Sequence, residues 1–353
     1  MPDVPHVPPA HETPWAIAEQ NRILHQHILT QRQLVPQGGG HRPYGPPHNI
    51  FVLPSDPAAF AHQPADLVVT ASAGLRLSEL NQVLRSHRQW IPLQPMDGLD
   101  DTVGGTVAAA VEGPYRGYGP FRDRIIGLTC IVPALGPINL GARVVKNVAG
   151  YNLTRIFWGS RGTLGVITAI TLKVSPLPES QAAWRVPVTW AQLSGKIAQL
   201  QDMMSTWASL SLIWQEDHLT LYAVAHGRKV RLTALEKQLG PAHATDLPVI
   251  SAEGPLLTIA GSIKRSSVID FLAHWPSAAP VQVEVQSGTF FGYLMRPSEH
   301  HQLRAWIRDN GGALRVLRDD NAITPSPFVS DPWWQQLKSQ FDPDGCLWDP
   351  RKG

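Results

Sequence analysis

Three glycine-rich clusters are the part of this sequence best suited to chemistry. They read Gln37-Gly38-Gly39-Gly40-His41, Asp101-Thr102-Val103-Gly104-Gly105 and Gly159-Ser160-Arg161-Gly162-Thr163-Leu164-Gly165. Glycine permits a positive φ and puts no Cβ between the main chain and a ligand, so N–H groups can converge on an anion such as a pyrophosphate. One such cluster is more often a tight turn between strands. Three clusters separated by strand-like segments favour a shared binding site.

Several other chemistries lack their motifs. The sequence has neither the mononucleotide loop GxxxxGK[ST] nor the dinucleotide fingerprint GxGxxG. HExxH and GxSxG are also missing, so zinc peptidase and serine hydrolase chemistry have no local support. Cys130 and Cys346 are the only cysteines and lie far apart. The chain is therefore expected to hold no disulfide framework, no metal and no iron–sulfur centre of its own.

Composition bounds the class of protein. With 353 residues, 43% hydrophobic and 16% charged, the chain can form two or three domains with a buried core. The formal net charge of +2, without long charge runs, argues against nucleic-acid binding. The sequence contains no run of 18 apolar residues, so no transmembrane segment is predicted. Residues 1–14 resemble a disordered proline-rich leader rather than a secretion signal. We expect a cytoplasmic protein, with peripheral contact at the inner face of the membrane through partners as an alternative.

The two halves of the chain are built differently. Of the 29 glycines, 18 lie between Gly38 and Gly165, whereas nine of the 12 tryptophans follow residue 180. In the first half, apolar periodicity predicts a helix over 15–31, strands at 34–35, 66–73 and 164–174, and a helix with Ser78 as its N-cap. Pro176 and Pro178 mark the boundary.

The second half alternates strands and helices. Strands are predicted at 184–188, 210–214, 219–225, 256–262, 281–286, 289–294 and 313–317, with helices at 191–204, 266–275, 298–309 and one ending at 239. These form two β-α-β-β-α units in tandem, a pattern typical of an antiparallel sheet covered by helices on one face. The alternative is that the similarity of the two units only reflects how common such units are.

The order of motifs in the first half resembles a known family. QGGGH, TASAGLRLSELNQVL, DTVGGTVAAAVEGP, YGPFRDRIIG and VVKNVAGYNLTRIFWGSRGTLGVIT follow one another as in the FAD-binding domain of the vanillyl-alcohol oxidase and p-cresol methylhydroxylase (PCMH) type. KNVAGYN and GSRGTLGVIT, with the chain length, are most similar to FAD-binding subunits of bacterial glycolate oxidase. The likeness covers roughly residues 15–178 and weakly resumes at 341–343.

The resemblance implies an α+β fold and a domain plan. A two-part PCMH-type FAD-binding domain at 15–178 would be followed by a ferredoxin-like antiparallel-sheet cap at 179–330, and a tail at 331–353 would return to the FAD domain. The tail FDPDGCLWDPRKG lacks the asparagine-proline-glycine common in the family. Contacts from the tail to the cofactor are therefore not predicted.

The resemblance also assigns cofactor-binding residues, in four regions of the chain. The first phosphate loop would be Gly38, Gly39, Gly40 and His41, the second Thr102, Gly104 and Gly105, with Gly113 at the turn beside the cofactor; Asn147, Gly150 and Tyr151 would line the flavin, and Gly162, Thr163, Gly165 and Ile167 the adenine side. Some members of the superfamily attach FAD to a histidine in such a GGH loop, whereas glycolate oxidase subunits usually carry a small hydroxyl residue there. Non-covalent FAD is therefore expected, with attachment through His41 as the alternative.

The implied activity is oxidation of glycolate, a small 2-hydroxy acid, to glyoxylate. Such a complex includes a catalytic flavoprotein subunit and an iron–sulfur subunit that receives the electrons. This sequence lacks the HxHxGDGN-like segment of the catalytic relatives, so its catalytic residues remain unassigned. Lys146 could hold a carboxylate or a flavin oxygen, or only form an ion pair within the sheet, and His300 and His301 are expected to be surface histidines. The alternatives are a stand-alone FAD-dependent 2-hydroxyacid or alcohol oxidoreductase and a non-catalytic flavin-binding assembly subunit.

Overall fold

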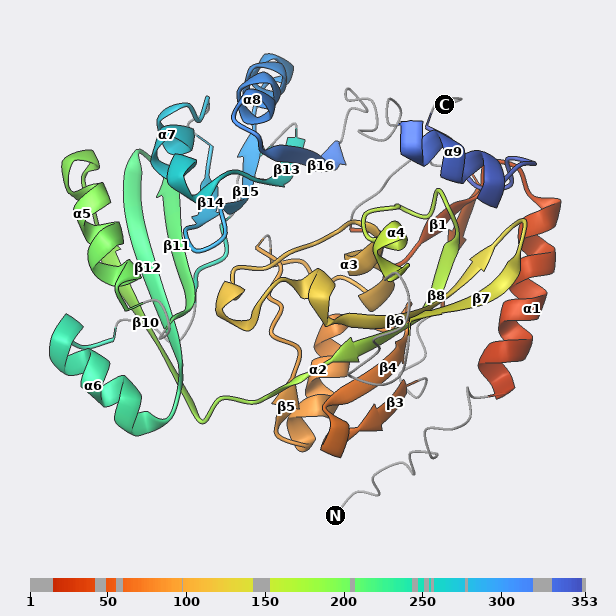
Figure 1. Cartoon of the computed structure of the whole chain (residues 1–353), viewed down its shortest axis with the longest axis horizontal. Coiled ribbons are helices and arrows are strands. Elements are labelled where there is room, and N and C mark those ends of the chain that lie inside the picture. Colours follow the sequence, from red (N-terminus) through yellow and green to blue (C-terminus); the bar gives the residue numbers. More distant parts are fainter. Residues whose placement is uncertain are drawn as a thin grey trace.

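The computed structural model describes most of the chain as two antiparallel sheets with their helices (Figure 1). The described residues are 15–41, 49–54, 60–96, 98–141, 153–203, 207–242, 247–250, 254, 257–276, 279–319 and 332–350. The mixture of helices and antiparallel strands confirms the α+β class. Within these residues, no helix is both long enough and apolar enough to span a bilayer.

The smaller sheet has five strands in the order β3-β4-β8-β6-β7. Its strands are β3 (Phe60–Gln63), β4 (Val68–Ser72), β6 (Ile125–Val132), β7 (Gly136–Gly141) and β8 (Val166–Lys173). The helices α2 (Leu77–Ser86), α3 (Val103–Ala108) and α4 (Thr154–Phe157) share one apolar core with it. This core also receives Trp334 of the C-terminal helix α9 (Pro332–Phe341), although α9 is remote in sequence.

Two short strand pairs complete the first part of the fold. β1 (Val35–Gln37) pairs in parallel with β2 (Ile50–Val52), and β5 (Gln89–Trp90) pairs with β9 (Ser175–Pro176). The N-terminal helix α1 (Trp15–Thr30) packs beside β6 and β7. Leu34 forms a parallel bridge with Leu347, so the C-terminal segment lies directly beside the start of β1.

The larger sheet has seven antiparallel strands in the order β10-β12-β11-β14-β15-β13-β16. Its elements in chain order are β10 (Ser180–Pro187), α5 (Trp190–Gln201), β11 (Trp207–Gln215), β12 (His218–Gly227), α6 (Lys229–Leu239), β13 (Leu257–Ser262), α7 (Val268–Ala273), β14 (Val281–Glu284), β15 (Thr289–Leu294), α8 (Pro297–Asp309) and β16 (Ala313–Asp319). The second unit has the β-α-β-β-α-β order and the 2-3-1-4 strand arrangement of a ferredoxin-like fold. The two units join where β11 pairs with β14.

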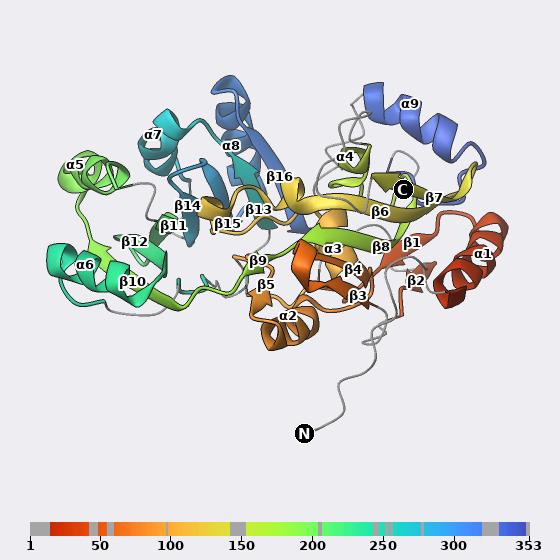
Figure 2. The same ribbon diagram turned by 60° about the horizontal axis from the view of Figure 1, so that its bottom comes forward.

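The two faces of the larger sheet have different partners. Helices α5 to α8 lie on the side away from the five-stranded sheet (Figures 1 and 2). Because strand side chains alternate, Phe290 packs among the helices against Phe271, while Phe291 packs on the opposite face with Met96 of the first part. The inner face of this sheet is therefore the seam between the two parts.

Helix α2 starts one residue earlier than predicted, and Ser78 is not its N-cap. The flanking residue is Arg76, whose main-chain N–H donates to Glu79 Oε2 over 3.2 Å. The Ser78 N–H and hydroxyl both donate to the carboxylate of Asp100, at 3.1 and 2.7 Å. The Asp100 carboxylate, 22 residues away in the sequence, thus accepts an N–H of the first helical turn that a neighbouring cap residue would otherwise accept.

Candidate functional site

The three glycine clusters meet around one pocket of about 50 Å³. Its lining comprises Pro36, Gly38, Leu53, Gly104, Gly105, Ala108, Gly162, Gly165 and Ile167. The structure therefore brings together six residues that we predicted for the cofactor site, from three segments that are distant in the sequence. Most of the pocket wall is main chain and small apolar side chain.

The first cluster offers unused main-chain donors. No described residue accepts a hydrogen bond from the N–H groups of Gly38, Gly39 or Gly40. A Cβ on Gly38 would lie 2.2 Å from Thr102 Oγ1, so only glycine fits there. Gly39 lies close to the Arg76 guanidinium, with 3.8 Å between its added Cβ and Nη1. Free donors beside a cation suit an anionic ligand.

The second cluster contributes shape rather than donors. Thr102 flanks α3, and its Oγ1 accepts the Gly105 N–H at 3.1 Å. The N–H groups of Val103 and Gly104 donate to the carbonyls of Leu75 and Ala73, both at 2.8 Å. These amides are thus already hydrogen-bonded inside the protein. A Cβ on Gly104 would lie 2.6 Å from that of Ala73, so glycine lets α3 approach β4 closely.

The third cluster is held from several sides. Gly162 has φ +75° and lies so close to Pro36 that an added Cβ would be 2.9 Å from its ring. Thr163 is fully buried, and its hydroxyl donates to Ser160 O at 2.6 Å and accepts from Trp334 Nε1 at 3.1 Å. Arg161 donates to the carbonyl of Val316 in β16. The cluster therefore contacts β1 just before the first cluster, α9 and the larger sheet.

The other predicted residues fall into two groups. His41 Nδ1 lies 3.7 Å from Asp101 Oδ1 at the end of the first loop. Gly113 lies outside the glycine pocket, against the main chain of Gln94. Asn147, Gly150 and Tyr151, together with Lys146, lie outside the described residues.

The expectation of two surface histidines was half wrong. Both lie in α8, where His301 is exposed but His300 is buried with 2% exposure, and burial lowers the pKa of His300 to about 4. The described residues contain no group of three His, Cys, Asp or Glu side chains that could hold a metal ion.

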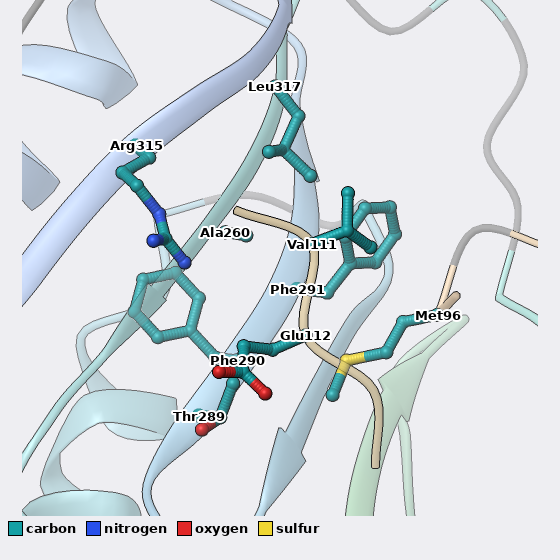
Figure 3. Close-up of a pocket in the computed structure, with 9 residues that line it drawn as sticks. All are labelled: Met96, Val111, Glu112, Ala260, Thr289, Phe290, Phe291, Arg315 and Leu317. Carbon is teal, nitrogen blue, oxygen red and sulfur yellow. The ribbon is translucent and has the colours of Figure 1, made fainter. Parts of the chain in front are cut away.

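A second pocket lies on the seam between the two parts (Figure 3). Met96, Val111 and Glu112 come from the first part, and Ala260, Thr289, Phe290, Phe291, Arg315 and Leu317 from the larger sheet. Its volume is about 10 Å³, which is room for one water molecule. A small ligand therefore needs side chains at this seam to move.

Two opposite charges meet across this second pocket. Glu112 accepts hydrogen bonds from Arg116 at 2.7 Å and from the Phe121 N–H at 3.0 Å. Arg315 points into the pocket, and its buried Nε has no acceptor among the described residues. Burial lowers the pKa of Arg315, and nearby Glu112 opposes that effect. A guanidinium with an unsatisfied donor can bind a carboxylate.

A buried carboxyl lies close to this seam, in the larger sheet. Glu284 has 0% exposure and accepts the Leu210 N–H at 3.0 Å and the Ser287 N–H at 3.0 Å. Burial raises its pKa to about 7, although these hydrogen bonds and the charge of Arg116 act in the other direction. Glu284 is therefore half protonated near neutral pH.

An aromatic cluster joins the two parts at the other end of the seam. Tyr115 and Trp90 pack against Ala208 and Val224 of the larger sheet. The Tyr118 hydroxyl lies 3.0 Å from His226 Nδ1, and the Tyr115 and His226 rings are 5.2 Å apart. These aromatic and apolar contacts hold the two parts of the molecule together at the seam.

We did not predict Glu112, Arg315 or Glu284 from the sequence. For Arg315 the sequence does hold a signal. Its neighbours Leu314 and Val316 pack on the helix-covered face of the sheet, so Arg315 lies on the opposite face, as does the buried Leu317. A single arginine on the inner face of a sheet is unusual, since buried charges need a partner or a ligand.

Comparisons with known proteins show which family the chain resembles. Residues 13–138 match the model of an FAD binding domain. The chain is 30% identical over 299 residues to glycolate oxidase subunit GlcE of Escherichia coli strain K12, covering 81% of this chain and 82% of that protein. It is 26% identical over 206 residues to glycolate oxidase subunit GlcD of Bacillus subtilis strain 168, covering 58% and 42%.

Two further comparisons extend the likeness. The chain is 37% identical over 115 residues to the mitochondrial D-lactate dehydrogenase [cytochrome] of Arabidopsis thaliana, covering 32% of this chain and 20% of that enzyme. A solved structure of alkyldihydroxyacetonephosphate synthase superposes with a TM-score of 0.62 at 15% identity, covering 94% of this chain and 74% of that one. At this identity, the structural likeness concerns the fold alone.

Glu284 should make stability depend on pH. Its pKa is about 4.5 in the unfolded chain and about 7 when folded, so the folded state retains a proton that the unfolded state releases. The stabilisation is complete below pH 4.5 and is lost as pH rises to about 7, by a total of about 3 kcal/mol. Urea unfolding at a series of pH values should show this slope in the wild type and not in Glu284→Gln. Glu236→Gln, at an exposed site on α6, is the control; parallel curves for wild type and Glu284→Gln would contradict the prediction.

Proposed function

The chain belongs to the FAD-binding family of glycolate oxidase subunit GlcE, and on this premise we propose that it is the FAD-binding subunit of a glycolate oxidase complex. The complex oxidises glycolate to glyoxylate. A catalytic flavoprotein subunit and an iron–sulfur subunit are its partners, and electrons leave through the latter. We place the complex in the cytoplasm, with any contact to the inner face of the membrane made through the partners.

The observation that carries this proposal is the row of N–H groups at Gly38, Gly39 and Gly40 beside the glycine pocket, for which the described residues offer no acceptor. A dinucleotide such as FAD carries a pyrophosphate that needs several N–H donors and close approach to the main chain. The residues present fit that group, because a Cβ at Gly38 or Gly162 would fill the space between neighbouring loops. The Arg76 side chain supplies positive charge.

The remaining site residues then take secondary roles. Thr102, Gly104 and Gly105 shape the floor under the phosphates, while Gly162, Thr163, Gly165 and Ile167 enclose the adenine side. Gly113, next to Glu112 at the seam, would form the turn beside the cofactor. We keep Asn147, Gly150 and Tyr151 as flavin-facing residues, and His41 as a neighbour of the phosphates.

Bound FAD would supply a two-electron acceptor for oxidation of a 2-hydroxy acid. Arg315 would bind and orient the substrate carboxylate, since its buried Nε lacks an acceptor. Glu112 would limit the mobility of Arg315 by charge, while Arg116 neutralises Glu112. The chain lacks the histidine-rich segment of its catalytic relatives, so the base for the hydroxyl proton would come from a partner.

Gly39→Ala should weaken FAD binding without disturbing the fold. The added Cβ would meet no protein atom closer than 3.7 Å, but it would stand where the pyrophosphate approaches. The dissociation constant of FAD, measured by quenching of flavin fluorescence, should rise about tenfold or more. Thermal unfolding of the apoprotein should be unchanged.

Two other glycine variants are matched controls for Gly39→Ala. Gly195→Ala in α5 has nothing within 4 Å and should raise stability by about 1 kcal/mol without changing FAD affinity. Gly104→Ala would crowd Ala73 and should lower the stability of the apoprotein itself. Equal FAD affinity of Gly39→Ala and wild type would refute the pyrophosphate assignment. Acid precipitation should leave FAD in the supernatant, and flavin in the pellet would favour attachment to His41.

Arg315→Met should weaken the binding of glycolate. It keeps an apolar stem and removes the cation, so the dissociation constant of glycolate should rise about 10- to 100-fold. Perturbation of the flavin absorbance of the assembled complex during an anaerobic titration measures it. Arg318→Met changes an exposed arginine on the same strand and should behave as wild type. An unchanged titration for Arg315→Met would exclude Arg315 from substrate binding.

The proposed function is tested with the chain alone and with its partners. Glycolate added under anaerobic conditions should bleach the flavin of this subunit only in the assembled complex. A complex built with Gly39→Ala should bleach less flavin than the wild-type complex, because this subunit has lost its FAD and only the partner's flavin is left to be reduced. Bleaching of the isolated chain would show a stand-alone oxidoreductase. Equal bleaching of the two complexes, although they differ in flavin content, would show a non-catalytic assembly subunit.

A further inference from the structure

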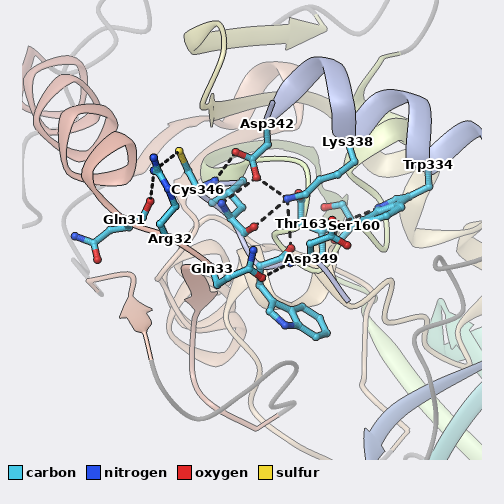
Figure 4. A network of polar contacts seen from close by, with 12 residues as sticks. Gln31, Arg32, Gln33, Ser160, Thr163, Trp334, Lys338, Asp342, Cys346 and Asp349 are labelled. Atoms are coloured by element: carbon cyan, nitrogen blue, oxygen red, sulfur yellow. Dashed lines mark hydrogen bonds and ion pairs between the residues drawn. The ribbon is translucent and has the colours of Figure 1, made fainter. Parts of the chain in front are cut away.

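A buried ammonium group connects the C-terminal segment to the third glycine cluster (Figure 4). The side chain of Lys338, in α9, is 3% exposed, and its Nζ donates to Thr163 O at 2.8 Å. The same Nζ donates to Asp342 Oδ2 at 2.6 Å, to Leu347 O at 3.0 Å and to Trp348 O at 3.3 Å. One cation therefore joins two segments that lie 175 residues apart in the chain.

Asp342 completes this network on the side of the tail. It is fully buried, and its two oxygens accept the N–H groups of Cys346 at 2.7 Å and Leu347 at 2.9 Å. The tail then pairs with the chain just before β1, since Leu34 N–H donates to Cys346 O at 2.8 Å and Trp348 N–H to Leu34 O at 2.9 Å. Three residues after this pairing, the chain enters the first glycine cluster.

The network therefore bears on both walls of the glycine pocket. Thr163 lies between Gly162 and Gly165, two of the lining residues, and its hydroxyl also accepts Trp334 Nε1 of α9. Pro36, another lining residue, lies in β1, two residues after Leu34, with which the tail pairs. Among the described residues, Lys338 Nζ is the one donor to Thr163 O. A movement of α9 and the tail would therefore release the loop that places Gly162 against Pro36.

We propose that Lys338 is a positioning residue for the FAD site, holding the Thr163 loop and the strand before the first glycine cluster at the spacing that FAD requires. The proposal rests on FAD binding at the glycine pocket, as proposed above. Lys338 acts through main-chain groups and is not itself expected to contact the cofactor. By linkage, FAD must in turn stabilise α9 and the tail.

Lys338→Met tests the proposal in the full-length chain. It retains the apolar stem and leaves Asp342 charged and buried, so the unfolding temperature should fall. Lys338→Met/Asp342→Asn removes both charges, so its unfolding temperature should fall less than that of Lys338→Met. In both, the dissociation constant of FAD should rise about tenfold or more at a temperature where the apoprotein is folded.

The matched control separates loss of stability from loss of positioning. Leu193→Ala opens a cavity in the helix-covered core of the larger sheet, where Leu193 is 0% exposed, and so also lowers the unfolding temperature. Its FAD affinity should stay within about twofold of the wild type. If Leu193→Ala and Lys338→Met lose FAD affinity equally, general destabilisation explains the loss and the proposal is overturned.

Hydrogen exchange of the wild type needs no variant. On saturation with FAD, amides of α9 and of residues 346–348 should exchange more slowly, whereas those of α5 should not change. Unaltered exchange in α9 and the tail, with FAD demonstrably bound, would overturn the role of Lys338. A wild type that binds no FAD would instead refute the proposed function, so the two failures are distinguishable.

Discussion

Close main-chain packing, possible only without a Cβ, is the constraint on which the glycine site depends. Gly38 lies against Thr102, Gly104 against Ala73 and Gly162 against Pro36, and an added Cβ would come within 2.2 to 2.9 Å of a neighbour in each case. Each contact joins segments that are distant in the sequence. The three clusters therefore form one continuous wall, whereas isolated glycine turns would each stand alone.

Within this wall the clusters divide the work. The amides of Val103 and Gly104 are consumed by the carbonyls of Leu75 and Ala73, so α3 is fixed to the core and cannot also donate to a ligand. In the first cluster, no described residue accepts the N–H groups of Gly38, Gly39 and Gly40. The third cluster is held by α9, where Lys338 and Trp334 donate to the carbonyl and the hydroxyl of Thr163.

The sequence predicted those parts of the molecule that depend on local residue patterns. Glycine spacing revealed the pocket wall, and alternation of apolar residues revealed both units of the larger sheet. The strands β6 and β7 were not predicted, because their segment was read as glycine-rich rather than for its apolar run at 125–132. Lys338 and the buried His300 could not be identified as such, since their burial depends on how remote elements dock.

The same docking makes the two parts of the molecule interdependent. Arg161 of the third cluster donates to the carbonyl of Val316, the residue next to Arg315 in β16. That strand is followed by the segment leading to α9, whose Lys338 binds the opposite side of the same cluster. The third glycine cluster is thus held by β16 through Arg161 and by α9 through Lys338. A shift of the larger sheet would therefore alter the glycine pocket and the seam pocket together.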